Sequence, residues 1–206
     1  MSSYGVVAAV SEVLRRILWE QFDADPVVRS IVGSESAIVF RNPTETARDA
    51  ANRLSVWLYQ ITENEFIKNQ PPLHRREAQS AIFPPRETRE SAPLALNLFY
   101  LLTPFSLTSE ADNLLIGKTM QILYDNSTIF VRDQVAELSE ELRIIFCRLS
   151  LEELTRIWEA LKEPYRLSIC YEVRVTHIDS LRRTEHVRIV DRYGRFRSDS
   201  LQAAGG

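Results

Sequence analysis

Two segments of the chain are apolar at nearly every position, which restricts where they can lie in a fold. Leu54–Ile61 reads LSVWLYQI, and Leu94–Thr103 reads LALNLFYLLT and is followed by Pro104. Aliphatic and aromatic side chains on both faces of a strand are typical of the interior of a sheet. The chain is therefore predicted to build a sheet around these two segments, with the second strand ending at Pro104.

Three further segments are predicted to lengthen this sheet. Ala37–Phe40 is a short apolar run, and Leu142–Cys147 is strand-like, whereas the residues from Thr128 up to that segment fit a helix or a strand equally well. Between Leu167 and Val175, apolar residues alternate with polar ones. Such alternation is typical of an antiparallel strand with one face in the core and the other in solvent.

Capping residues and apolar periodicity predict two long helices. In the first, apolar residues recur at three- and four-residue spacing from Val6 to Leu18, with Ser2 or Ser3 as the cap and Asp25-Pro26 as the end. In the second, Thr108 is followed by acidic residues in the first turn, which the positive end of a helix dipole favours. This second helix is predicted to reach Tyr124.

Two more capping signals predict shorter elements. Asn42-Pro43 predicts a turn or one short helix, because Pro is well accommodated at the first helical position. Ser150-Leu-Glu-Glu153 has the form of a capping box and should begin a helix that Pro164 ends. That helix carries one apolar stripe, made of Leu151, Leu154, Ile157, Trp158 and Leu161.

Residues 69–93 are predicted to form a long irregular loop. Five prolines, at positions 71, 72, 84, 85 and 93, alternate there with the charged runs HRRE and RETRE. Prolines at this density exclude a regular element, and a loop of this length within a compact domain is usually functional.

The predicted fold class is therefore α+β, with a mixed or mostly antiparallel sheet, helices packed on one side, and a C-terminal arm. The chain has 206 residues, of which 45% are hydrophobic, and this suits one domain with a sizeable core. The predicted boundaries are residues 1–180 for the domain and residues 181–206 for an arginine-rich arm.

Composition argues against several classes of partner and location. The net charge of −3 gives no global electrostatic reason to expect nucleic acid or an anionic membrane. No apolar run is long enough to insert into a membrane, and the N-terminus has no signal peptide, so a cytoplasmic location is expected. Cys147 and Cys170 both lie in apolar stretches, as small buried thiols of a reducing compartment do.

No set of residues predicts catalysis, a cofactor or a metal. Gly117-Lys118-Thr119 matches the end of a phosphate-binding loop, but Asp112 stands where that motif requires Gly, and the segment falls within a predicted helix. A Cys147–His177 dyad is conceivable in space, although a core thiol and a strand-end histidine explain both residues more simply. No catalytic, cofactor-binding or metal-binding residue is therefore predicted.

The C-terminal arm is the candidate interaction site. Its arginines can pair with acidic residues of a protein neighbour, and its apolar residues can add a short strand to a partner's sheet. A frayed basic tail without a role stays open as the alternative. The residues predicted to make these contacts are Arg182, Arg183, Val187, Arg188, Ile189, Arg192 and Arg195.

Three stretches together resemble a known family. They are RLSVWLYQITENEFIKN (Arg53–Asn69), PLALNLFYLLTPF (Pro93–Phe105) and the span from Leu149 to Ser180, which contains LSLEELTRIWEAL and PYRLSICYEVRVTHIDS. In order and spacing they resemble the cap or tail-terminator proteins of extracellular, phage-tail-like contractile injection systems. The resemblance implies a structural protein that forms a ring, usually sixfold, on the end of the inner tube and ends the contractile sheath. It implies tube and sheath proteins as partners, and it supplies no catalytic residues.

Two other functions remain open at this point. One is an adaptor that anchors such a particle to another structure, for example a membrane-bound partner. The other, more remote, is a hydrolase or nucleotide-binding enzyme, which would need a convergent polar pocket.

Overall fold

The computed structural model describes residues 5–49, 52–66, 73–76, 87–90, 94–132, 139–178 and 183–186. The chain divides into two compact units. The first consists of residues 1–71 and 92–180, and the second of residues 72–91 and 181–206. Each unit contains its own sheet.

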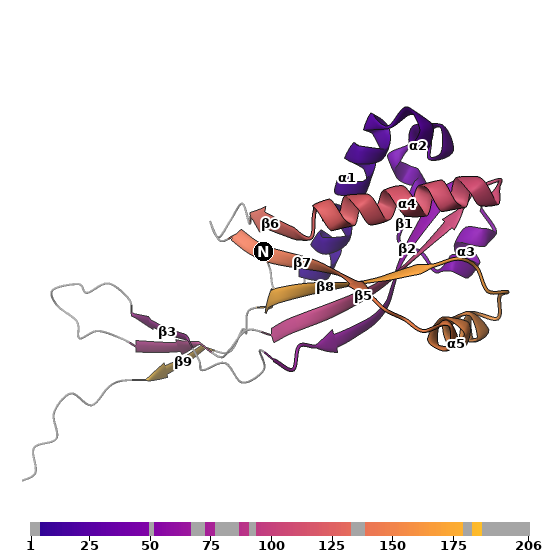
Figure 1. The fold of residues 1–206 in the computed structure, drawn as a ribbon. Coiled ribbons are helices and arrows are strands. Elements are labelled where there is room, and N and C mark those ends of the chain that lie inside the picture. The colour runs from indigo at the N-terminus through magenta and orange to yellow at the C-terminus, as the bar shows by residue number, and fades with distance from the viewer. Residues whose placement is uncertain are drawn as a thin grey trace, which may run out of the picture. The chain divides into compact units, whose positions relative to one another are not determined.

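The first unit is built on a six-stranded sheet with the order β1-β2-β5-β8-β7-β6 (Figure 1). Its strands are β1 (Ile38–Val39), β2 (Arg53–Glu63), β5 (Leu94–Phe105), β6 (Thr128–Arg132), β7 (Ser139–Cys147) and β8 (Ile169–Ile178). β1 pairs with β2 in parallel, and every other pair in this sheet is antiparallel. The predicted α+β class with a mostly antiparallel sheet is confirmed.

The two apolar segments form the interior strands β2 and β5, which pair with each other. β5 continues two residues past Thr103, the predicted last residue, so Pro104 lies in the strand opposite Leu54. A proline is tolerated near a strand end because it removes only one ladder donor. β2 is buried only at its start, from Leu54 to Val56, and its later residues are half-buried or exposed. The sequence of β2 thus predicts its central position correctly but overstates how much of it is covered.

Helices α1 (Val6–Ala24) and α4 (Ser109–Asp125) lie on one side of the sheet, together with the short α2 (Pro26–Ile31) (Figure 1). Leu18 and Phe22 of α1 are fully buried, as are Leu98 and Tyr100 of β5, and all four belong to one hydrophobic core. α1 begins later than predicted, because Gly5 occupies the capping position instead of Ser2 or Ser3, which lie outside the described residues. Its first buried residue, Val6, is also its first helical one.

Local capping signals place the other helix starts as predicted. Thr108 Oγ1 accepts a hydrogen bond from the Ala111 N–H at 3.2 Å at the start of α4. Asn42 Oδ1 accepts one from the Thr44 N–H at 2.8 Å at the start of α3 (Pro43–Ala47). A 3-10 turn, η2 (Glu35–Ala37), leads into β1. Each signal acts within a few residues, which is why the sequence identifies it reliably.

Helix α5 (Leu151–Leu161) departs from the prediction that the helices pack on one side of the sheet. It begins at the predicted capping box of Ser150 and Glu153, and it lies on the opposite side of the sheet from α1 and α4 (Figure 1). Within its apolar stripe only Trp158 is fully buried, whereas Leu151 is 67% exposed. The helix ends at Leu161, before Pro164, because Lys162 adopts a left-handed conformation with φ of 57°.

The second unit contains a three-stranded antiparallel sheet with the order β3-β4-β9. Its strands are β3 (Leu73–Arg76), β4 (Glu87–Glu90) and β9 (Arg183–His186). The prediction that residues 69–93 hold no regular element was therefore wrong. The two strands carry HRR and ETRE, and the prolines fall outside them, so backbone pairing can form there without an apolar pattern that a sequence reading would recognise.

Candidate functional site

The phosphate-loop fragment lies within α4, as predicted. Thr119 is fully buried, and its hydroxyl donates to the Leu115 carbonyl at 2.7 Å. Lys118 Nζ lies 3.3 Å from Asp25 Oδ2, which links α4 to the junction between α1 and α2. The same Asp25 carboxylate accepts the N–H groups of Val27 and Val28, which hold its pKa below the usual value. Lys118 therefore has a structural partner on the helix surface.

The conceivable Cys147–His177 dyad does not form. Cys147 on β7 pairs with Cys170 on β8, and His177 lies seven residues further along β8. At a strand rise of about 3.3 Å per residue, the two positions on β8 are separated by roughly 23 Å. Among the residues that the structure describes, no group of three or more His, Cys, Asp or Glu side chains could hold a metal ion. Within that same part of the chain, no helix is both long and apolar enough to cross a membrane.

Most of the predicted arm falls outside the described residues. Arg183 begins β9 and pairs with Glu90 of β4, so this part of the arm extends a sheet of its own chain. Nothing further is described for the other predicted contact residues, which are Arg182, Val187, Arg188, Ile189, Arg192 and Arg195.

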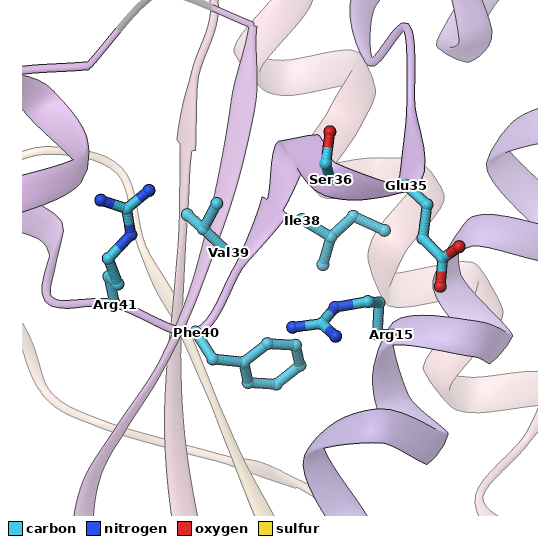
Figure 2. A pocket seen from close by; sticks show the side chains of 7 residues that line it. All are labelled: Arg15, Glu35, Ser36, Ile38, Val39, Phe40 and Arg41. Atoms are coloured by element: carbon cyan, nitrogen blue, oxygen red, sulfur yellow. The ribbon is translucent and has the colours of Figure 1, made fainter.

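The described residues form a cleft beside β1, which lies at one end of the six-stranded order (Figure 2). The cleft has a volume of about 620 Å³ and is open to solvent. The wall of the cleft is formed by α1, by the 3-10 turn η2, by β1 and by the two residues that follow β1. The lining residues are Arg15, Glu35, Ser36, Ile38, Val39, Phe40 and Arg41.

A basic side chain from α1 covers the aromatic part of this cleft. The Arg15 guanidinium carbon lies 5.0 Å from the centre of the Phe40 ring, and Figure 2 shows the two side chains facing each other. Glu12, one turn earlier on α1, accepts a hydrogen bond from Arg15 Nη1 at 2.7 Å. The Phe40 ring in turn meets Tyr100 edge to face at 6.4 Å between centroids. These contacts fix a cation over an apolar floor that continues into the core.

The backbone of β1 is held from the inner side of the sheet. Ser55 Oγ donates to the Arg41 carbonyl at 2.8 Å, and Arg41 Nη2 lies 3.0 Å from Asp49 Oδ2. The Ile38 N–H donates to the Glu35 carbonyl, which closes the 3-10 turn. β2 is the only described strand that pairs with β1, so the other edge of β1 has no described strand beside it. An unpaired sheet edge can accept an extended segment of another chain.

Sequence reasoning missed this cleft. Arg15 and Phe40 are 25 positions apart, and neither belongs to a local motif. Arg15 only breaks the apolar periodicity of α1, and Phe40 only ends an apolar run. The site arises from the packing of α1 beside β1, and the sequence carries no short-range signal for that packing.

Comparison with known proteins gives a family and a fold. Residues 9–192 match the family model described as the Pvc16 N-terminal domain. No curated protein sequence gives a match.

Two solved structures share the fold. The sheath/tube terminator of the PVC extracellular contractile injection system, in the extended state, is 20% identical with a TM-score of 0.51. The match covers 85% of this chain and 62% of that one. The tube-terminating cap of the anti-feeding prophage is 21% identical with a TM-score of 0.50, over 82% of this chain and 57% of that one. The matched region thus spans about three-fifths of the length of each of these proteins.

Proposed function

Because this chain belongs to the Pvc16 N-terminal domain family, we propose that it is a cap or tail-terminator subunit of a contractile injection system. In this role it ends the inner tube and the contractile sheath, and its partners are tube and sheath proteins. The observation that carries the proposal is the fold shared with two such terminators along 82% or more of the chain.

The features of the described surface support a role that depends on shape. A terminator must bind the last layer of a polymer and offer no site for the next layer. The six-stranded sheet provides the cleft beside the edge of β1, where an extended segment from tube, sheath or a neighbouring subunit can pair. Such pairing needs no catalytic group, so the proposed role is structural and not enzymatic.

The proposed assembly is a closed ring of six copies. Closed cyclic symmetry leaves no free interface along the ring, which is what a subunit that ends a polymer requires. We expect the ring to form on the tube in the cytoplasm, and any release of the particle to occur on lysis. Mass photometry of the free protein shows whether a ring forms in solution. Microscopy of particles shows whether a ring is present on the tube end.

The arm is proposed as an attachment to sheath or to the adjacent subunit, through Arg182, Arg183, Val187, Arg188, Ile189, Arg192 and Arg195. Removal of residues 187–206 keeps β9 and its pairing with β4. We expect this truncation to leave the melting temperature of the protein nearly unchanged and to reduce its recovery on purified particles. A truncated protein that unfolds would show that the segment belongs to a core. A truncated protein that attaches normally would place attachment elsewhere, at the retained Arg182 and Arg183 or at the β1 cleft.

Deletion of the gene tests the proposed function. Particles assembled without this protein should have tubes and sheaths of uncontrolled length in negative-stain images, and expression of the wild-type protein should restore a uniform length. If the particles keep their length but no longer attach to another structure of the cell, the protein is an adaptor. If the particles are normal in both respects, the proposal is wrong.

A further inference from the structure

The two cysteines lie directly opposite each other in the six-stranded sheet. Cys147 is the last residue of β7 and pairs in register with Cys170 of β8. Both are free thiols. They are 23 positions apart in the sequence, so the strand register alone brings them together.

The surroundings of the two thiols differ. Cys170 is 2% exposed, and its Sγ lies 3.3 Å from the Tyr59 hydroxyl oxygen. Cys147 is partly exposed and is therefore the thiol that a small solute reaches first. Burial raises the pKa of both thiols, and that of Cys170 to about 12. At neutral pH both sulfurs are therefore mostly protonated, which slows their reaction with an oxidant.

The register also allows a bond between the two sulfurs. Directly opposite residues of an antiparallel pair have Cβ atoms about 4.5–5.5 Å apart, whereas a disulfide places them about 3.5–4.5 Å apart. A small approach of β7 and β8 closes this difference. The resulting disulfide would be strained and readily reduced, which is typical of labile disulfides.

We propose that Cys147 and Cys170 are a redox-sensitive cross-strand pair, which closes to a disulfide when the protein meets a peroxide. In the first step, the Cys147 sulfur attacks one peroxide oxygen and the O–O bond breaks, which yields a sulfenic acid and one water. In the second step, the Cys170 sulfur attacks the Cys147 sulfur, the S–S bond forms, and a second water leaves with the Cys170 proton. The two thiols are thereby oxidised, and one hydrogen peroxide is reduced to two waters.

The disulfide would enclose helix α5 in a covalently closed loop. The segment between the two cysteines contains all of α5, the helix whose apolar stripe has Trp158 as its one fully buried residue. A covalent link between β7 and β8 closes this segment into a loop and reduces its freedom in the unfolded chain. Oxidation should therefore raise the free energy of unfolding of the folded protein.

The test uses the full chain, purified with reductant and then transferred to buffer without it. Hydrogen peroxide should remove both thiols together, with an intact mass lower by two hydrogens and a peptide map that joins residues 147 and 170. The melting temperature should rise by about 5 °C and return after treatment with dithiothreitol.

Matched variants complete the test. Cys147→Ser and Cys170→Ser each keep one thiol and should show neither the loss of two hydrogens nor the rise in melting temperature. Since Cys147 is partly exposed, Cys147→Ser should fold even if Cys170→Ser does not. Wild-type protein that keeps both thiols, or that forms only sulfinic acid or disulfide-linked dimers, would overturn the proposal.

Discussion

The two faces of the six-stranded sheet carry similar apolar sequences but different cover. On the face under α1 and α4, Leu98, Tyr100 and Leu102 of β5 are at most 1% exposed. On the other face, Trp57, Tyr59 and Phe99 form a row of ring contacts with centroids 6.0 and 6.3 Å apart, and all three remain half-buried. α5 lies on that side (Figure 1). The helix-covered face therefore holds the larger core, whereas the second face buries Leu101 and Cys170 but leaves this aromatic row only half-buried.

Substitution of two consecutive residues of β5 gives the largest expected difference between the faces. Leu98→Ala removes a fully buried side chain from the helix-covered core and should lower the free energy of unfolding by about 2–5 kcal/mol. Phe99→Ala acts on the half-buried row and should cost only about 1 kcal/mol. Urea unfolding of both variants measures the difference. Equal costs would show that the second face is a fully packed core, contrary to this comparison.

The attachment of α5 should depend on one residue. Trp158→Ala removes its only fully buried side chain and should weaken local packing by about 3 kcal/mol. Hydrogen exchange should then speed up in α5 while α1 and β5 keep their protection. The matched change Leu151→Ala, at a residue 67% exposed, should alter exchange little. Loss of protection throughout the first unit after Trp158→Ala would instead make α5 part of the same cooperative core.

The capping box gives α5 a smaller and pH-dependent contribution. The Ser150 backbone N–H and hydroxyl donate to Glu153 Oε2 at 2.8 Å and hold the pKa of that carboxyl below its usual value of 4.5. A lowered pKa in the folded protein means that this contribution is complete above the usual value and is lost as the pH falls through the folded value.

Ser150→Ala should therefore cost about 1 kcal/mol near neutral pH, measured by thermal unfolding. The difference in stability between wild type and variant should shrink as the solution is made more acidic. A difference that stays constant with pH would show that the Glu153 carboxylate takes no part in the cap.

The smallest effect is expected on the helix-covered side, at Lys118. Its ion pair with Asp25 is partly solvated, and such pairs contribute little. Lys118→Ala should lower the melting temperature by no more than about 2 °C and change no nucleotide binding. Calorimetric titration with ATP provides the check. ATP binding by the wild type that Lys118→Ala abolishes would reinstate the nucleotide-binding alternative.

The sequence predicted those parts of the fold whose signals are local. Asn42, Thr108 and Ser150 each cap a helix through a hydrogen bond to a residue at most three positions away. In β2 and β5, apolar residues on both faces of the strand indicate an interior position in the sheet. The pairing of β3, β4 and β9 could not be predicted, because polar strands pair through their backbones and leave no periodic pattern.

The candidate site was less predictable than the fold. The β1 cleft depends on Arg15 reaching Phe40 from another element, and the cysteine pair depends on the register of β7 and β8. Neither follows from short-range spacing. The assembly role came from the order and spacing of whole segments, which a family shares even where no single motif identifies it.

A reconstruction of the particle end by electron cryo-microscopy tests the proposed function most directly. The account predicts a closed ring of six copies on the last layer of tube and sheath, with the fold of the first unit in each subunit. A particle end occupied by another protein, with this chain absent or located at a different place on the particle, would contradict it.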